Sequence, residues 1–158
     1  MRSVRMGIAK GGVGPVLMLT AFITHAQTNE HVIKYRQATM KAIGGNMAAI
    51  SLIIKNRFLP QQNLVEHARE IQGASTLIES AFEQEVSSGR TDALPKIWSD
   101  WESFLSIVKK MEEESGRLVE IGTSGDLKSI TQQVKALARS CGKCHKRFRK
   151  PKAKSYKQ

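Results

Sequence analysis

Apolar residues recur at intervals of three and four along most of the chain, which is the spacing of one face of an α-helix. The first such stretch runs from 30 to 55, with Ile33, Ile43 and Ile50 at inward positions. A second runs from 61 to 86 and follows a proline that stops one element or starts the next. No strand-rich segment interrupts these stretches, so the pattern indicates a helical protein.

Two further helical stretches follow a loop at 90–98. Ser99 or Asp100 is suited to cap the third helix, because short polar side chains accept hydrogen bonds from free backbone N–H groups. After a glycine-bounded turn at 122–125, the fourth helix begins near Asp126. Since short connections favour antiparallel neighbours, the pattern predicts an all-α fold, an antiparallel up-down-up-down four-helix bundle.

The first 26 residues have the layout of a secretory signal peptide rather than of a folded element. Three basic residues precede an apolar run at 11–23, and Ala26 offers a small residue for cleavage before Gln27. The apolar run is short for a membrane span. An uncleaved anchor is the alternative to a signal peptide at 1–26, and cleavage would leave one domain at 27–150 followed by a tail.

Positive charge is concentrated at the C-terminus. The formal net charge is +11, but the last thirteen residues alone contain seven basic residues and no acidic residue. We therefore expect 151–158 to be a basic flexible tail, which solubilises the protein or attracts an acidic redox partner or anionic lipid. Because the rest of the exported chain has no basic stripe, no nucleic acid partner is expected.

The chemistry of the chain is concentrated in one motif. Cys141 and Cys144 are separated by two residues and followed directly by His145, which is the C-x-x-C-H pattern of covalent haem attachment. In this pattern the two thiols form thioethers with the haem vinyl groups, and the histidine becomes an axial ligand of the iron. The chain has no other cysteine, so the motif predicts one covalent haem c.

Other uses of the two thiols fit less well. A structural zinc site needs four ligands in paired spacing, and the remaining histidines are not paired in this way. A thioredoxin-like site needs a βαβ pattern, which is missing here. A simple disulfide would leave the role of His145 unexplained.

Two features of the apolar tracks concern the haem. Cys141 and Cys144 continue the inward series of Val134 and Leu137, so the haem is expected in the core of the bundle. Arg36 also occupies an inward position, where a guanidinium needs an anion. A haem propionate would provide one, since the arginine fork suits a carboxylate. The alternative is that the aliphatic part of the Arg36 side chain lies along the core while its guanidinium reaches water.

The chain resembles the cytochrome c′ family. The resemblance rests on V-I-K-Y-R-Q at 32–37, P-K-I-W-S-D at 95–100 and C-G-K-C-H-K-R-F-R at 141–149, and it extends over nearly all of 27–158. It implies a four-helix bundle with haem bound to Cys141 and Cys144.

The resemblance also assigns roles to single residues. It implies that His145 is the proximal ligand, that Arg36 contacts a propionate and that Arg149 lies beside the proximal histidine. Phe82 would line the haem pocket, and Met40 would lie over the distal face of the iron.

Met40 leaves two alternatives open. In cytochrome c′ the distal residue does not bind the iron, which is then five-coordinate and open to NO or CO. In the similar cytochrome c-556 group a methionine of the first helix is the sixth ligand, and the pattern M-K-x-x-G-x-x-M of that group occurs here at 40–47. A methionine on an inward track is also a common core residue.

These observations predict an exported, periplasmic mono-haem c-type cytochrome that binds haem and iron and transfers electrons. The alternative is a five-coordinate haem protein that binds NO or CO. No enzymatic activity is expected, because the helix around Met40 lacks the polar distal groups that a peroxidase needs. A redox protein is the expected partner, and the resemblance adds a homodimer as an alternative to a monomer.

Overall fold

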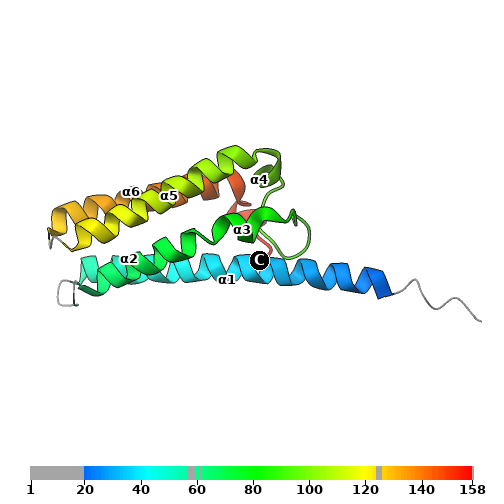
Figure 1. The fold of residues 1–158 in the computed structure, drawn as a ribbon, viewed down its shortest axis with the longest axis horizontal. Coiled ribbons are helices and arrows are strands. Elements are labelled where there is room, and N and C mark those ends of the chain that lie inside the picture. Colours follow the sequence, from blue (N-terminus) through cyan, green and yellow to red (C-terminus); the bar gives the residue numbers. More distant parts are fainter. Residues whose placement is uncertain (1–19, 57–59, 61, 124–125, 158) are drawn as a thin grey trace, which may run out of the picture.

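The structure, a computed structural model, describes residues 20–157 apart from 57–59, 61 and 124–125 (Figure 1). Within this part of the chain four long helices dominate: α1 (Thr20–Lys55), α2 (Gln62–Ser75), α5 (Trp101–Gly122) and α6 (Leu127–Phe148). Three shorter elements complete it: α3 (Ile78–Glu83), α4 (Lys96–Ser99) and the 3-10 helix η1 (Lys152–Lys154). The first part of the predicted signal peptide, 1–19, lies outside the described residues.

The second predicted helix is divided in two. A continuous helix over 61–86 was expected, but the structure ends α2 at Ser75 and begins α3 at Ile78. The hydroxyl of Ser75 donates to the carbonyl of Gln72 at 2.7 Å, and that of Thr76 donates to Gly73 at 2.9 Å. Both hydroxyls thus bind carbonyls of the last turn of α2, at the point where this helix ends.

An N-terminal cap is present at the predicted start of α6, whereas the cap predicted at Asp100 for α5 is not present. Asp126 accepts hydrogen bonds from the backbone N–H groups of Lys128 at 3.1 Å and Ser129 at 3.2 Å, so the predicted start of α6 is confirmed. Asp100 makes no side-chain capping bond at α5 and instead pairs with Arg147. A single-turn helix, α4, also occupies part of the loop predicted at 90–98.

The four long helices pack in the predicted order, with α1 against α2, α2 against α5, and α5 against α6. By contrast, the backbones of α1 and α6 hardly come close to one another. Figure 1 shows the pair α1–α2 lying below the pair α5–α6, with α3 and α4 at the same end of the bundle. The backbones of α1 and α6 therefore stay farther apart than those of the other neighbouring helices, and side chains of the common core lie between them.

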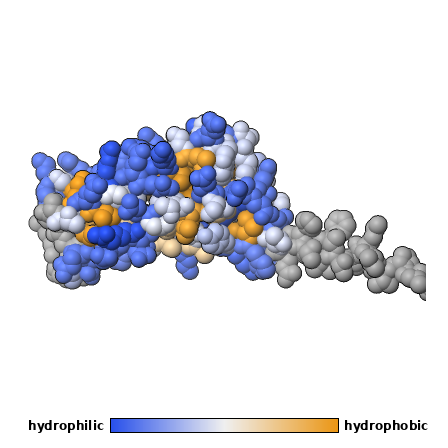
Figure 2. All heavy atoms as spheres, in the orientation of Figure 1, coloured by the Kyte–Doolittle hydropathy of each residue, from blue (hydrophilic) through white to orange (hydrophobic). Residues whose placement is uncertain are grey.

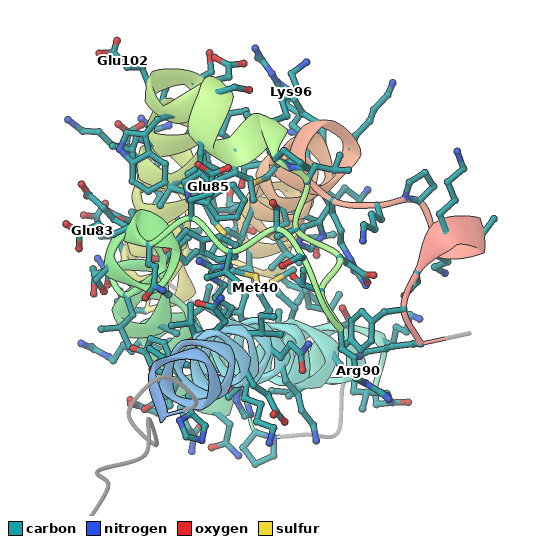
Figure 3. The ribbon with its side chains drawn as sticks, turned by 90° about the vertical axis from the view of Figure 1, so that its right-hand side faces the viewer. Met40, Glu83, Glu85, Arg90, Lys96 and Glu102 are labelled. Carbon is teal, nitrogen blue, oxygen red and sulfur yellow. The ribbon has the colours of Figure 1, made fainter. Side chains whose placement is uncertain are left out.

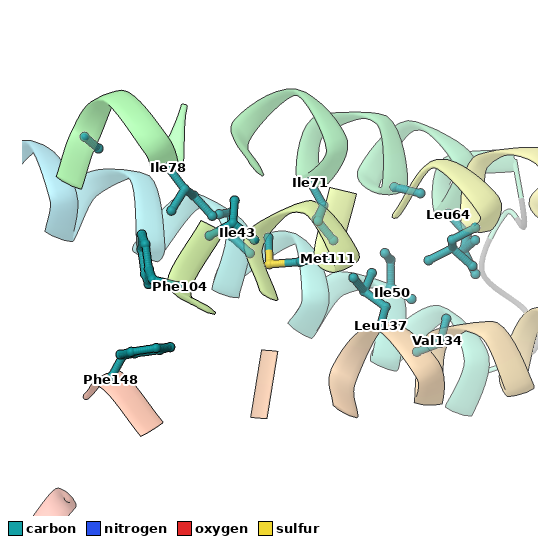
Figure 4. Close-up of a cluster of buried hydrophobic side chains, with 14 of the residues drawn as sticks. Ile43, Ile50, Leu64, Ile71, Ile78, Phe104, Met111, Val134, Leu137 and Phe148 are labelled. Atoms are coloured by element: carbon teal, nitrogen blue, oxygen red, sulfur yellow. The ribbon is translucent and has the colours of Figure 1, made fainter. Parts of the chain in front are cut away.

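The core runs the length of the bundle and is formed by one side of every long helix (Figure 4). Ile50, Leu64, Ile71, Leu118 and Leu137 are completely buried, in agreement with the apolar tracks of the sequence. The visible outer surface in Figure 2 is mainly hydrophilic, with small apolar patches. No helix among the described residues is both long enough and apolar enough to cross a membrane.

The C-terminal segment differs from the flexible tail expected at 151–158. Asp92 accepts a hydrogen bond from the hydroxyl of Ser155 at 3.0 Å and another from the backbone N–H of Tyr156 at 3.1 Å. Upstream of these contacts, Arg149 forms an isolated antiparallel bridge with Ala93. The segment is thus held against the loop before α4, because a buried carboxylate offers acceptors that the tail can satisfy.

Candidate haem site

Cys141 and Cys144 lie on the same side of α6, as expected for residues three positions apart on a helix. Both are partly buried, both are free thiols, and both pack against the main hydrophobic cluster. Burial raises the pKa of the Cys141 thiol, and burial together with the neighbouring Cys141 raises the pKa of Cys144 to about 11. Two protonated thiols therefore face the interior at the C-terminal end of α6.

His145 follows directly on α6, and its residue surface is exposed. Desolvation by the surrounding chain lowers the pKa of its imidazole, and the positive charge of Arg149 lowers it further. The neutral ring is favoured as a result, and this is the form in which histidine binds a metal. The motif thus combines two inward thiols with an adjacent neutral imidazole.

Met40 lies on α1, whereas the cysteines lie on α6. It is partly buried and packs against the same hydrophobic cluster as Cys141 and Cys144. Figure 3, a view along the bundle, places Met40 near its centre, on the side of α1 that faces the other helices. A thioether on α1 and two thiols on α6 therefore meet the same apolar core, on the side of the bundle where the backbones of α1 and α6 stay apart.

This arrangement fits a covalently attached haem. The donor set is two cysteines and one histidine on α6, and the apolar cluster against which both cysteines pack would surround the ring. A zinc site fits poorly, since the described residues bring no three His, Cys, Asp or Glu side chains together. When bound, a haem would add an iron that exchanges single electrons and binds axial ligands.

Arg36 is buried, with 3% of its surface exposed, so the alternative of a side chain extended to water is wrong. Its Nε donates to the carbonyl of Ala81 at 2.7 Å and its Nη1 to that of Val86 at 2.9 Å. Its Nη2 donates to the carbonyl of Gln84. Burial lowers the pKa of the guanidinium to about 10, so it stays charged at neutral pH.

The partners of Arg36 differ from those expected. The guanidinium binds backbone carbonyls in the last turn of α3 and in the segment directly after it, where carbonyls lack intrahelical donors. It also lies 4.8 Å from the ring centroid of Phe82 and 5.1 Å from that of Trp98. No anion is among the contacts of this cation in the described residues, so pairing with a propionate stays a prediction.

Phe82 belongs to an aromatic cluster at the haem end of the bundle. Its ring centroid lies 5.4 Å from that of Phe104, which lies 5.4 Å from Phe148 and 5.3 Å from Trp101. The Nε1 of Trp98 donates to the carbonyl of Phe82 at 2.7 Å. The predicted pocket residue is therefore part of a packed apolar wall.

Asp92 was not singled out from the sequence, yet it organises this end of the molecule. Its carboxylate lies 3.0 Å from the guanidinium of Arg149, and its side chain is 9% exposed. Arg149 in turn lies close enough to His145 to influence its pKa. The only sequence signal was that Asp92 is the one acidic residue between Arg90 and Asp100, in a loop close to a basic segment.

Comparison with known proteins agrees with this geometry. A family profile described as Cytochrome C' matches residues 31–149. Cytochrome c' from Rhodospirillum rubrum is 26% identical over 133 residues, which cover 84% of this chain and 90% of that protein. Cytochrome c-556 from Agrobacterium tumefaciens is 27% identical over 120 residues, covering 74% of this chain and 95% of that protein.

Solved structures show the same similarity. Cytochrome c prime from Shewanella frigidimarina superposes with a TM-score of 0.73 at 25% identity, covering 78% of this chain and 97% of that one. The nitric oxide complex of a variant of cytochrome c prime from Alcaligenes xylosoxidans gives a TM-score of 0.71 at 25% identity with the same coverage. With its bundle, its cysteine pair and its match over most of the length, the chain belongs to the cytochrome c′ family of haem-binding c-type cytochromes.

Proposed function

We propose that this protein is an exported mono-haem c-type cytochrome that transfers single electrons. In this proposal, Cys141 and Cys144 form the thioethers of haem c, and His145 is the proximal ligand. The observation that carries it is the inward position of both thiols on α6, with the histidine next in sequence. The haem would contribute an iron that changes its charge by one.

The chain would contribute a rigid and largely dry environment for this change of charge. The aromatic wall around Phe104 and the isoleucines of α1 and α2 keep water from the interior. Arg36 is held by three carbonyls and does not need to move when the charge in the core changes. A packed surrounding of this kind keeps the rearrangement that accompanies electron transfer small.

Binding of NO or CO is the second candidate function. It is supported by solved relatives whose titles describe nitric oxide and carbon monoxide complexes. Met40 would then cover the distal side without binding the iron, and a small gas would enter beside its flexible side chain. Electron transfer is favoured if the Met40 sulfur is the sixth ligand.

Enzymatic turnover is not part of the proposal. The neighbours of Met40 along the inward side of α1 are Arg36, Ile43 and Met47. Arg36 already donates to three backbone carbonyls, so it is a poor candidate for a distal acid or base. A peroxidase-type reaction would need polar catalytic groups in this region.

The proposal is tested by haem attachment. Replacement of Cys141 or Cys144 by Ala should reduce covalent haem loading, and the double variant should lose it, because no other thiol is present. The measurement is the pyridine haemochrome spectrum after denaturation and acid-acetone extraction. The matched control is Ser140→Ala, which neighbours the motif and removes no thiol. Wild-type protein that releases all of its haem in the extraction would contradict the proposal.

Export to the periplasm is tested separately. N-terminal sequencing of periplasmic protein should give Gln27 or a residue a few positions away. A soluble, haem-loaded protein that retains Met1 would contradict the signal peptide.

A further inference from the structure

Charge is distributed unevenly along the last fifth of the chain. From Leu127 to Gln158 there are eleven basic residues and no acidic residue, and seven of the eleven follow directly after His145. A run of like charges usually repels itself into a disordered segment. Here the segment after α6 is instead held in place, so its charges have a defined position.

The contacts that hold the segment come from two adjacent residues of the loop before α4. The carboxylate of Asp92 accepts hydrogen bonds from Ser155 and Tyr156. Its backbone carbonyl accepts another from the backbone N–H of Lys150 at 2.8 Å. The ammonium of Lys150 donates to the carbonyl of Thr91 at 2.9 Å. Five hydrogen bonds, including that from Arg149, thus fix the segment 149–156 to this loop.

The same loop connects to α1. Gln37 of α1 donates to the backbone carbonyl of Arg90 at 2.8 Å, and the Arg90 guanidinium lies 5.9 Å from the ring centroid of Tyr156. Figure 3 shows the C-terminal segment leaving the end of α6 and running toward the side of α1 where Arg90 lies. The segment therefore borders the side of the bundle between α1 and α6, next to the attachment motif.

The surface formed here carries excess positive charge. Arg147 and Arg149 are paired with Asp100 and Asp92, and both of these acids are at least partly buried. Exposed lysines remain on the segment itself, Lys154 and Lys157, and the exposed Arg90 lies beside Tyr156. We call the surface formed by Lys154, Lys157 and Arg90 the basic face.

We propose that the basic face is the docking surface for an acidic redox protein, which exchanges an electron with the haem at this edge of the bundle. Electrostatic attraction speeds the encounter of such partners without requiring a long-lived complex, and this suits electron exchange. The inference rests on the proposed electron-transfer function. It adds the surface at which the electron is exchanged and the charge of the partner protein.

An anionic membrane fits this surface less well than a protein does. Binding at a membrane surface combines basic residues with apolar or aromatic side chains that insert between lipids. Within the described chain, the exposed large hydrophobic residues are Tyr35, Leu52 and Leu77, none of which lies in the basic face. The one aromatic residue of the segment, Tyr156, is only partly exposed and lies beside Arg90.

The experiment compares two double charge reversals in the full, haem-loaded protein. Lys154→Glu/Lys157→Glu alters the basic face. Lys55→Glu/Lys128→Glu makes the same change of charge at the opposite end of the bundle, about 30 Å along α6. The probe is oxidised plant plastocyanin, an acidic protein whose copper(II) accepts one electron from the reduced cytochrome and becomes copper(I). Tris(phenanthroline)cobalt(III), a cationic one-electron oxidant, is the second probe.

At low ionic strength, the reversal on the basic face should slow the reaction with plastocyanin by at least about fivefold and speed the reaction with the cobalt complex. The reversal at the far end should change either rate by less than about twofold, and high salt should remove the differences. Equal effects of the two variants on plastocyanin would overturn the inference. Co-sedimentation of the wild type with anionic phospholipid vesicles that is lost in Lys154→Glu/Lys157→Glu, with plastocyanin rates unchanged, would overturn it in favour of a membrane.

Failure of this inference differs from failure of the proposed function. Haem content and the reduction potential are measured for every variant before the kinetics. Absence of covalent haem or of a reversible one-electron couple in the wild type contradicts the function. A reversible couple with no preference for the basic face contradicts only the docking surface.

Discussion

The Asp92 carboxylate lies 3.0 Å from the Arg149 guanidinium and joins the loop before α4 to the end of α6. Burial by itself raises the pKa of Asp92, but hydrogen bonds from Arg149, Tyr156 and Ser155 together lower it below its usual value of 3.8. Asp92 is therefore a charged anchor, and through Arg149 it also acts on the surroundings of His145.

The first prediction concerns acid stability. Because the pKa of Asp92 is lower in the folded than in the unfolded state, its stabilisation is complete above the unfolded value of 3.8 and is lost as the pH falls through the folded value. Asp92→Asn should lower the free energy of unfolding at pH 7 by about 1–3 kcal/mol. The difference between wild type and variant should shrink toward pH 2, as measured by urea unfolding.

Glu79→Gln, at an exposed position on α3, is the control for loss of one carboxylate. Hydrogen exchange adds a local measurement, since the amide of Tyr156 should lose protection in Asp92→Asn. A difference in stability that stays constant from pH 7 to pH 2 would count against Asp92 as the anchor.

Met40 decides between the two candidate functions. If its sulfur binds the iron, the ferric protein is low-spin, the ferrous protein takes up little CO, and Met40→Ala becomes high-spin and binds CO. If Met40 is only a cover, the wild type is already high-spin and Met40→Ala speeds CO binding. Visible and EPR spectra with CO flash kinetics measure this, and the lost volume should cost about 2 kcal/mol.

Met47→Ala is the matched control, because Met47 lies seven residues later on α1 and is also partly buried against the core. It should leave the spin state unchanged. A protein in which Met40→Ala stays low-spin while Met47→Ala becomes high-spin would assign the sixth ligand to Met47 and contradict both versions.

Arg36 should be important for stability at the haem end. Arg36→Met keeps much of the side-chain length but removes the donors to Ala81, Gln84 and Val86, leaving carbonyls at the end of α3 without a partner. We expect a loss of about 3 kcal/mol in the free energy of unfolding, since hydrogen bonds to charged groups contribute about 1.5–3 kcal/mol each. Urea unfolding at equal haem content measures it.

Arg36→Lys separates charge from geometry. The lysine keeps the positive charge but lacks the planar fork that reaches three carbonyls at once. The free energy of unfolding of Arg36→Lys should therefore lie between that of the wild type and that of Arg36→Met. If Arg36→Met cost less than about 1 kcal/mol, the carbonyl contacts would have little energetic weight.

Two glycines provide a test of packing between helices. A Cβ at Gly122, the last residue of α5, would lie 2.9 Å from Cγ2 of Val65, whereas a Cβ at Gly73 on α2 would meet nothing within 4 Å. Gly122→Ala should therefore destabilise the protein by about 1–3 kcal/mol. Gly73→Ala should stabilise it by about 0.5–1 kcal/mol through helix propensity. Thermal unfolding of both variants would show opposite shifts, and shifts of equal sign would contradict the packing of α2 against α5.

Local patterns predicted the four long helices and the cap at Asp126, because both depend on residues close in sequence. The break between α2 and α3 was missed, because the inward residues Ile71, Ser75, Ile78 and Phe82 keep the spacing of one continuous helix across it. The position of the C-terminal segment was missed as well. Its anchor, Asp92, is 57 positions from Arg149, and a local pattern carries no information on such a contact.

The site shows the same division. The cysteine motif is local, and the structure brings Cys141 and Cys144 to the inward side of α6 as the apolar track predicts. Arg36 was correctly identified as a buried cation, but its partners on Ala81 and Val86 are 45 and 50 positions away. Backbone carbonyls also have no signature in the sequence, because every residue has one.

The near absence of contact between α1 and α6 has a consequence for assembly. The polypeptide consists of two helical hairpins, α1–α2 and α5–α6, joined along one seam between α2 and α5. Hairpins with local contacts form quickly, on the microsecond to millisecond scale. Each hairpin can therefore form on its own contacts, and a haem attached to α6 beside Met40 of α1 would then join the two hairpins along the side where their backbones stay apart.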